Sequence, residues 1–318
     1  MTRSVQAATT RRVAAIDIGT NSVILLVVEA SSSGVRSIVD RAAITRLGFG
    51  VDRTLRLDGA SSERTLECLR LFADELERLG VKSRQVVGTS ALRDASDGDE
   101  FLSRAEGILG VRPRVLSGED EARLTFRGAL SGLNFAENVT VFDVGGGSTE
   151  VIAGRASTRE SEVDRAISVD IGAVRLLERH IKHDPPQPEE LLAVQQDIRM
   201  HLPESTRYRD SSSVVGVAGT VTTLFAMTQQ LAAYDGERVH GGRLRRAEVQ
   251  YWSDTLARQA VDERRGITGL EPKRADVIGI GALIVLELMD WLGTKEVVVS
   301  DRGVRWGLVE QALRSERA

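Results

Sequence analysis

Two short turns in the sequence combine an aspartate, glycines and side chains that can hydrogen-bond to an anion. The turns are DIGTNS, which begins at Asp17, and DVGGGS, which begins at Asp143. Glycines let successive backbone N–H groups point into one concavity, and such concavities bind phosphate oxygens. Each turn is therefore a candidate phosphate-binding loop. The residues expected to contact phosphate are Gly19, Thr20, Asn21, Ser22, Gly145, Gly146, Gly147 and Ser148.

The aspartate at the start of each turn indicates that a metal ion takes part. A carboxylate alone would repel phosphate, whereas Mg²⁺ prefers one or two carboxylates together with phosphate oxygens and water. Asp17 and Asp143 are therefore candidate metal ligands. The structural alternative is a glycine-rich hairpin turn that binds no ligand. Two such turns with matching residues favour the functional interpretation.

A third segment rich in glycine and threonine is GVAGTVTT. Val214 to Val217 reads as a buried strand, and Gly219 and Thr220 then open a helix together with Thr222 and Thr223. The N-terminus of a helix points its free N–H groups at a bound anion. Thr and Gly are also routine helix-capping residues, so the motif taken alone favours a capping role.

The elements around the two turns repeat along the chain. Apolar, β-branched runs VAAIDI and VILLVVE flank the first turn, and VTVFDV precedes the second, so that each reads as strand, turn, strand. A duplicated α/β unit predicts two similar domains facing each other across a cleft. No linker rich in Pro, Gly or Ser separates the halves. The hinge between them is expected near residues 118 to 125.

Composition bounds the class of protein. With 318 residues, of which 42% are apolar, the chain is long enough for two domains. The net charge of −4 argues against a generally basic surface for nucleic acid. Neither an apolar leader nor a run of about 18 apolar residues is present, so a cytoplasmic protein without a membrane partner is expected. Cys68 falls within an apolar helical stripe and is expected to be a structural, reduced thiol.

These motifs, with GTSALRDA, SGEDEAR and VSDRGVRWGLV, resemble the exopolyphosphatase/guanosine pentaphosphate phosphohydrolase (Ppx/GppA) family from about Val13 to Leu308. That family lies in the superfamily of acetate and sugar kinases, heat-shock chaperones and actin. The resemblance implies two duplicated actin-like (ribonuclease H-like) α/β domains, with mixed five-stranded sheets flanked by helices and the active site in the interdomain cleft. The short form of the family implies domains at 1–122 and 123–303, with a helix at about 304–318 packing back on the first domain.

The resemblance also implies a function. We expect an exopolyphosphatase that removes orthophosphate from the end of inorganic polyphosphate, with Mg²⁺, or Mn²⁺ as an alternative, and a water activated by a glutamate. A guanosine pentaphosphate (pppGpp) 5′-phosphohydrolase is the alternative, since the family shares these motifs between both substrates. A non-catalytic phosphate sensor, a kinase or an ATP-dependent chaperone has less support. A homodimer is expected.

Candidate catalytic groups come from two of the motifs. SGEDEAR places Glu119, Asp120 and Glu121 where a strand becomes a helix, and spacing alone does not choose among them. Acids in a first helical turn also complement the helix dipole, and Ser117 is a candidate N-cap. The resemblance assigns the general base to Glu121. It assigns the second essential carboxylate to Glu150, which would hold Mg²⁺ with Asp143.

The remaining candidates are an arginine and the histidines. The resemblance places Arg93 on the phosphoryl oxygens, where a guanidinium would stabilise transferred charge; the alternative is an ion pair with Asp94 or Asp97. His180 and His183 lie near the end of a helix and favour a structural role. His240 lies in a polar loop and could line the cleft. No nucleophile elbow is present, so direct attack by water is expected.

Overall fold

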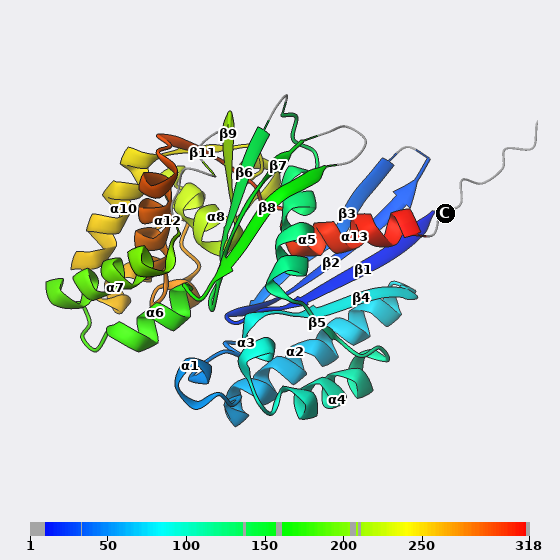
Figure 1. Ribbon diagram of the computed structural model, residues 1–318. Helices are drawn as coiled ribbons and strands as arrows, with labels where there is room; N and C mark the ends of the chain where they lie inside the picture. Colours follow the sequence, from blue (N-terminus) through cyan, green and yellow to red (C-terminus); the bar gives the residue numbers. More distant parts are fainter. Residues whose placement is uncertain are drawn as a thin grey trace, which may run out of the picture.

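The computed structural model describes residues 10–32, 34–135, 138–156, 161–203, 208 and 211–315. Its framework is two β-sheets, one in each of two lobes, with helices packed on their faces (Figure 1). Residues 1–9 of the predicted first domain and 316–318 of the predicted last helix lie outside the described residues. Among the residues that are described, no helix combines the length and apolar character needed to span a bilayer.

The first sheet has five strands in the order β3-β2-β1-β4-β5. Its first three strands are antiparallel neighbours, and β4 and β5 continue the sheet in parallel with β1. β1 and β2 are apolar on both faces because helices cover both sides of this sheet. The strands are β1 (Arg11–Ile18), β2 (Ser22–Ser31), β3 (Gly34–Ile44), β4 (Ser83–Gly88) and β5 (Arg114–Val115).

The second sheet repeats this topology and adds one strand. Its order is β10-β11-β9-β6-β7-β8, in which β6, β7 and β8 correspond to β1, β2 and β3. β10 pairs antiparallel with β11 and makes a sixth strand where five were predicted. The strands are β6 (Asn138–Val144), β7 (Thr149–Arg155), β8 (Glu162–Val169), β9 (Ser213–Val217), β10 (Arg243–Arg245) and β11 (Glu296–Val299).

The hairpin turns confirm the predicted duplication at the level of single hydrogen bonds. Gly19 N donates to Ser22 O at 2.9 Å, and Gly145 N donates to Ser148 O at 3.0 Å. Across the two hairpins, Asp17 faces Ile24 and Asp143 faces Glu150. The first turn therefore has one carboxylate where the second has two.

Helices cover both sheets. On the first lobe the long helix α2 begins at its N-cap Asp58, whose side chain accepts from Ser61 N, and its apolar stripe is buried. Cys68 in this stripe is buried and unpaired, and burial raises the pKa of its thiol to about 11. The helices are α1 (Val51–Thr54), α2 (Gly59–Arg78), α3 (Ser90–Asp94), α4 (Gly98–Leu109), α5 (Gly118–Leu130), α6 (Ala173–His180), α7 (Pro188–His201), α8 (Ala218–Thr228), α9 (Gly236–Val239), α10 (Arg246–Arg258), α11 (Val261–Arg264), α12 (Ile278–Leu292) and α13 (Val304–Ser315).

Two helices lie where the lobes meet. α13 runs from the second lobe back to the first and lies beside α5 and β1 (Figure 1). Leu308 and Val309 of α13 share one buried cluster with Val13 and Leu26 of the first sheet. α5 packs Phe126 and its neighbours on the second sheet. The boundary proposed at residue 122 therefore falls inside a helix that contacts both lobes.

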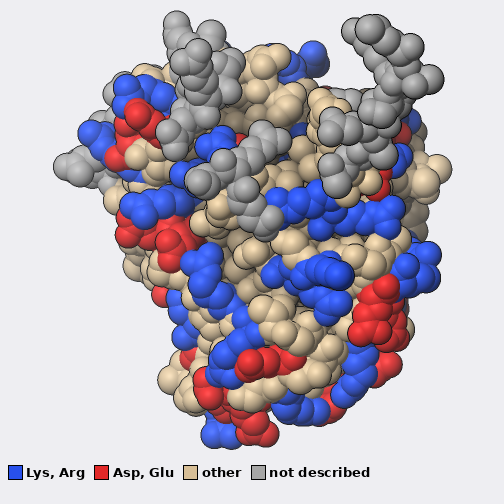
Figure 2. Space-filling view, turned by 90° about the vertical axis from the view of Figure 1, so that its right-hand side faces the viewer, with Lys and Arg blue, Asp and Glu red and all other residues tan. Residues whose placement is uncertain are grey.

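Charged side chains on the face at the right of Figure 1 are mixed in sign. Figure 2 shows Lys and Arg side chains there in separate groups, with Asp and Glu beside several of them. Ion pairs at the surface of the first lobe include Arg41 with Glu75 at 2.9 Å and Arg12 with Glu29 at 3.1 Å. Such exposed pairs contribute little to stability, typically below about 1 kcal/mol each.

Candidate active site

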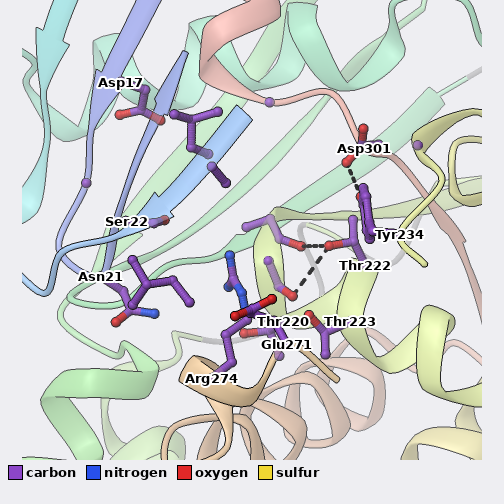
Figure 3. A pocket seen from close by; sticks show the side chains of 18 of the residues that line it. Asp17, Asn21, Ser22, Thr220, Thr222, Thr223, Tyr234, Glu271, Arg274 and Asp301 are labelled. Atoms are coloured by element: carbon purple, nitrogen blue, oxygen red, sulfur yellow. Dashed lines mark hydrogen bonds between the residues drawn. The ribbon is translucent and has the colours of Figure 1, made fainter. Parts of the chain in front are cut away.

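A large cleft lies between the lobes, with a cavity volume of about 1840 Å³. Both phosphate-loop candidates open into it, and the start of α8 forms a third part of its wall. Figure 3 shows Asn21 and Ser22 on one side of the cavity and Thr220, Thr222 and Thr223 on the other. All of the residues predicted to bind phosphate line this cleft, namely Gly19, Thr20, Asn21, Ser22, Gly145, Gly146, Gly147, Ser148, Gly219 and Thr220.

The two turns touch each other at the bottom of the cleft, and only glycine allows this approach. A Cβ atom on Gly146 would lie 3.0 Å from the Cβ of Thr20. A Cβ on Gly147 would lie 2.5 Å from the Oγ of Ser90. Real Cβ atoms essentially never come as close as the contact at Gly147, and the contact at Gly146 is tighter than most, so the second turn needs small residues here for packing.

Four carboxylates gather beside the turns. Asp17, Glu121 and Asp143 line the cleft, and Glu121 is only 8% exposed. Glu150 is not among the lining residues. It is 1% exposed and accepts a hydrogen bond of 2.6 Å from the Oγ of Ser168. The structure therefore brings the predicted carboxylates together but places Glu150 behind the surface of the cleft.

Burial and mutual repulsion make these carboxylates weak acids. Burial raises the pKa of Asp17 to about 7, with the charge of Glu121 as the second cause. Burial followed by the charge of Glu121 also raises the pKa of Asp143 to about 7. The pKa of Glu150 is raised well above its usual value by burial and by the neighbouring acids. Such clustering strongly favours a bound cation, because a cation relieves the repulsion.

The donor atoms fit a magnesium ion that takes part of its ligands from the substrate. Asp17 Oδ1 is buried and has no hydrogen-bond partner among the described residues. No group of three or more His, Cys, Asp or Glu side chains suited to holding a metal ion occurs in that part of the chain. Mg²⁺ is commonly bound through one or two carboxylates with substrate phosphates and water rather than by a complete protein cage. Asp17 and Asp143 at the cleft surface suit this mode.

Glu121 is fixed in place by its helix and by an arginine. Ser117 caps α5, as predicted, with its Oγ accepting from Asp120 N at 3.1 Å. Arg93 Nη1 donates to Glu121 Oε2 at 3.0 Å and to Leu116 O at 2.9 Å. Burial raises the pKa of Glu121, and the charge of Arg93 opposes this rise. Glu121 is thus a buried carboxylate held in one orientation at the edge of the cleft.

The ion pair of Arg93 differs from the predicted alternative, a pair with Asp94 or Asp97. Its ion pair is with Glu121, whereas Asp94 pairs with Arg175 and Asp97 with Arg56. Arg93 is not among the residues that line the cleft. The contact of Arg93 with the phosphoryl oxygens therefore stays a prediction. Its ion pair with Glu121 positions that carboxylate, the candidate base.

One cleft residue that the sequence analysis missed is Arg274, which ends the short 3₁₀ helix Pro272–Arg274. Its side chain lies beside Thr220 and Glu271 in the cavity (Figure 3). A Cβ on Gly219 would lie 1.9 Å from Arg274 Nη1, so this glycine makes room for the guanidinium. Arg274 has no ion pair within 4.0 Å among the described residues, and burial lowers its pKa. The only sequence signal was the basic pair in EPKRAD.

The third motif also shows part of its structural alternative. α8 begins at Ala218, one residue before the predicted start, and Ala218 has a φ of 69°. The Oγ1 of Thr222 donates to Ala218 O at 3.1 Å, so this threonine serves its own helix. Gly219 and Thr220 remain on the cleft wall, and their phosphate contact stays a prediction.

Side chains of α6 connect the second turn to the first lobe. Arg175 Nε donates to Gly147 O at 2.6 Å, and its Nη1 pairs with Asp52 of α1 at 2.5 Å. Glu178 accepts from Gly50 N at 3.0 Å. These contacts hold the two lobes together directly beside the phosphate turns.

The histidines divide as predicted. His180 Nε2 bonds Asp197 at 2.6 Å and His183 Nδ1 bonds Glu190 at 2.8 Å, so each has a separate carboxylate partner and a structural role. His240 lines the cleft, with its Nε2 3.0 Å from Ser131 O. Burial, followed by the charge of Arg302, lowers the pKa of His240 to about 4.

The lowered pKa of His240 predicts a specific acid sensitivity. Because the folded-state pKa lies below the usual 6.5, the stability gained from neutral His240 is complete above pH 6.5 and is lost as the pH falls towards 4. Between pH 6.5 and pH 4 the unfolding free energy of the wild type should therefore fall through the protonation of His240. In His240→Gln this fall should be smaller by about 2 kcal/mol. Urea unfolding at several pH values measures it. His183→Gln is the control, and an equal pH slope in wild type and His240→Gln would contradict the prediction.

The chain is similar to proteins of one known family over nearly all of its length. The profile of the Ppx/GppA phosphatase family matches residues 26–316. Exopolyphosphatase 2 of Mycobacterium tuberculosis is 35% identical over 314 residues, which cover 93% of this chain and 97% of that protein. Guanosine-5′-triphosphate,3′-diphosphate pyrophosphatase of Aeromonas hydrophila is 30% identical over 299 residues, which cover 93% of this chain and 58% of that protein.

Solved structures agree with this result. The crystal structure of the Ppx/GppA family member of Aquifex aeolicus superposes with a TM-score of 0.81 at 32% sequence identity, and the match covers 98% of this chain and all of that one. The fold class predicted from the sequence, two duplicated actin-like α/β domains, is confirmed.

Proposed function

Because the chain belongs to the Ppx/GppA phosphatase family, we propose that it is an exopolyphosphatase, which releases orthophosphate from the end of inorganic polyphosphate. The chain is a phosphoanhydride hydrolase. The observation that carries the proposal is the contact of the two glycine-rich turns in one cleft, directly beside a buried carboxylate, Glu121. Its close relative in Mycobacterium tuberculosis supports polyphosphate as the substrate.

In this mechanism the turns hold the terminal phosphate and Glu121 activates the water. Backbone N–H groups of the second turn, with Ser148, bind the oxygens of the terminal phosphoryl group. Glu121 accepts a proton from the attacking water as the new P–O bond forms and the phosphoanhydride P–O bond breaks. The raised pKa of Glu121 suits a base that works near neutral pH. The products are orthophosphate and a chain shorter by one phosphate.

The other acidic residues have a supporting role. Asp17 and Asp143 would hold Mg²⁺ at the cleft, and Glu150, which accepts a hydrogen bond from Ser168, would help to hold the ion or its water shell. The ion would neutralise charge on the phosphate oxygens. Arg93 positions Glu121 through their ion pair. Mn²⁺ as a replacement ion, a homodimeric state and a cytoplasmic location belong to the same proposal.

pppGpp is the alternative substrate, because the relative in Aeromonas hydrophila is named for a guanosine nucleotide. The same turns and Glu121 would act on its 5′-phosphates. The two substrates differ in what lies beyond the terminal phosphate, where Arg274 and Tyr234 line the cleft.

Orthophosphate release separates these functions. The purified protein is incubated with polyphosphates of graded length, pppGpp and ATP at matched phosphate-end concentration, with Mg²⁺ or with EDTA. We expect release from polyphosphate to exceed that from either nucleotide and to stop in EDTA. Faster release from pppGpp would favour the alternative, and no release from any substrate would remove the proposal.

A further inference from the structure

A second cavity lies inside the second lobe, away from the phosphate turns. It has a volume of about 600 Å³ and lies among α6, α7, α10, α11 and α12. Figure 1 shows α6, α7, α10 and α12 at the side of the second lobe that is far from α13. Apolar side chains, among them Leu177, Ile181, Leu191 and Leu283, form much of its wall. Cavities of this size and character bind small organic molecules.

One buried cation on the wall forms no close ion pair with a described residue. Arg264 lines the cavity and is only 3% exposed. Its Nη1 donates to Ala275 O at 3.1 Å, but its Nε has no hydrogen-bond partner among the described residues. It also forms no ion pair within 4.0 Å in that part of the chain. The charges of Asp184 and Asp276 act on Arg264 only from beyond this distance. A buried guanidinium without a direct carboxylate contact is costly, so a second group is expected to complete its hydrogen bonds.

The nearby carboxylates are already engaged elsewhere. Asp184 accepts from Val261 N at 3.0 Å. Asp276 pairs through Oδ2 with Arg46 of the first lobe at 2.8 Å. The Oδ1 of Asp276 is buried and has no partner among the described residues, so it can accept one further hydrogen bond. The cavity thus offers an apolar interior, one buried cation without a close ion pair and one acceptor without a partner, and the exposed Lys182 is a second cation on its wall.

We propose that this cavity binds a small amphipathic organic acid, whose apolar body fills the space between the helices and whose acid group pairs with Arg264. An N–H or O–H group next to the acid would donate to Asp276. A metal ion or a polyphosphate end does not suit this site, because most of its wall is apolar. The proposal does not depend on the substrate of the cleft.

The position of the site connects it to the cleft. Asp276 and Gly279 line the cavity, whereas Lys273 and Arg274 of the same segment line the cleft. Arg46, the partner of Asp276, also donates from Nη2 to Lys273 O at 3.0 Å, and its backbone N donates to Asn21 O at 3.0 Å. A ligand that contacts Arg264 and Asp276 is therefore connected to the first glycine-rich turn through the ion pair between Asp276 and Arg46.

Two probes that differ by one acid group test the proposal on the full chain. Anilinonaphthalene sulfonate carries an apolar body, an N–H group and a sulfonate, and N-phenylnaphthylamine lacks only the sulfonate. Binding is measured from the fluorescence of the probe. We expect anilinonaphthalene sulfonate to saturate at one molecule per chain. We expect the second to bind about ten-fold more weakly, since the charge-assisted hydrogen bond is lost.

Three variants locate the binding. Arg264→Met should weaken sulfonate binding about ten-fold, and Ala257→Trp, which fills the cavity from α10 without removing Arg264, should abolish it. Arg243→Met, in the same lobe but on the surface, should change nothing. Thermal melting checks that each variant is folded. Equal affinity for both probes, or unchanged binding in Ala257→Trp, would overturn the proposal even if Arg264→Met fails to fold.

Discussion

Replacing Glu121 by Gln is expected to lower orthophosphate release about a thousand-fold while polyphosphate still binds, because general-base catalysis typically contributes 10² to 10⁴ in rate. Gln keeps the size of the side chain and can still accept the hydrogen bond that Arg93 Nη1 donates at 3.0 Å. It cannot take a proton from water. The loss should therefore appear in kcat, with KM nearly unchanged.

Glu119→Gln is the matched control for this change. Glu119 lies in the same first turn of α5 but is exposed and pairs with Arg123 at 2.6 Å. Steady-state phosphate release and equilibrium binding of a labelled polyphosphate would be measured for both variants. Near wild-type kcat in Glu121→Gln, or an equal loss in Glu119→Gln, would remove Glu121 as the base.

Replacing Asp143 by Asn is expected to lower activity about a hundred-fold at limiting Mg²⁺, because loss of one carboxylate weakens metal binding. Asp143 is at the cleft surface with a pKa of about 7, raised by burial and by the charges of Glu121 and Asp17. Asn removes the charge that would attract the ion. High Mg²⁺ should restore part of the activity.

Asp235→Asn gives the control for the loss of a cleft carboxylate. Asp235 lines the same cleft, but its side chain caps α9 by accepting from Glu237 N, and Asn caps helices equally well. Phosphate release would be measured over a range of Mg²⁺ concentrations. If Asp143→Asn needs no more Mg²⁺ than wild type, Asp143 is not a ligand of the ion.

Local features of the sequence predicted the parts of the site that depend on neighbouring residues. The matching Gly and Asp pattern predicted a strand, turn, strand unit at both places, and the two turns form the same internal hydrogen bond, because turn geometry depends on a few adjacent residues. Ser117 was predicted as a cap from its place before three acids, and it caps α5. β10 was missed because its three residues carry too little alternation to indicate a strand.

Contacts between distant residues were decided only by the tertiary structure. The alternative to a phosphate contact for Arg93 was an ion pair with Asp94 or Asp97, but Arg93 pairs with Glu121, which lies 28 residues further along the chain. Arg274 reaches the cleft because Gly219, far away in the sequence, leaves room for its guanidinium.

By itself, the sequence determined the duplicated α/β units and the two glycine-rich turns, since apolar periodicity and glycine placement act over short distances. The tertiary structure alone decided how buried each carboxylate is. Asp17, Glu121, Asp143 and Glu150 come from four different elements, and their raised pKa values exist only because folding removes water and places these charges together.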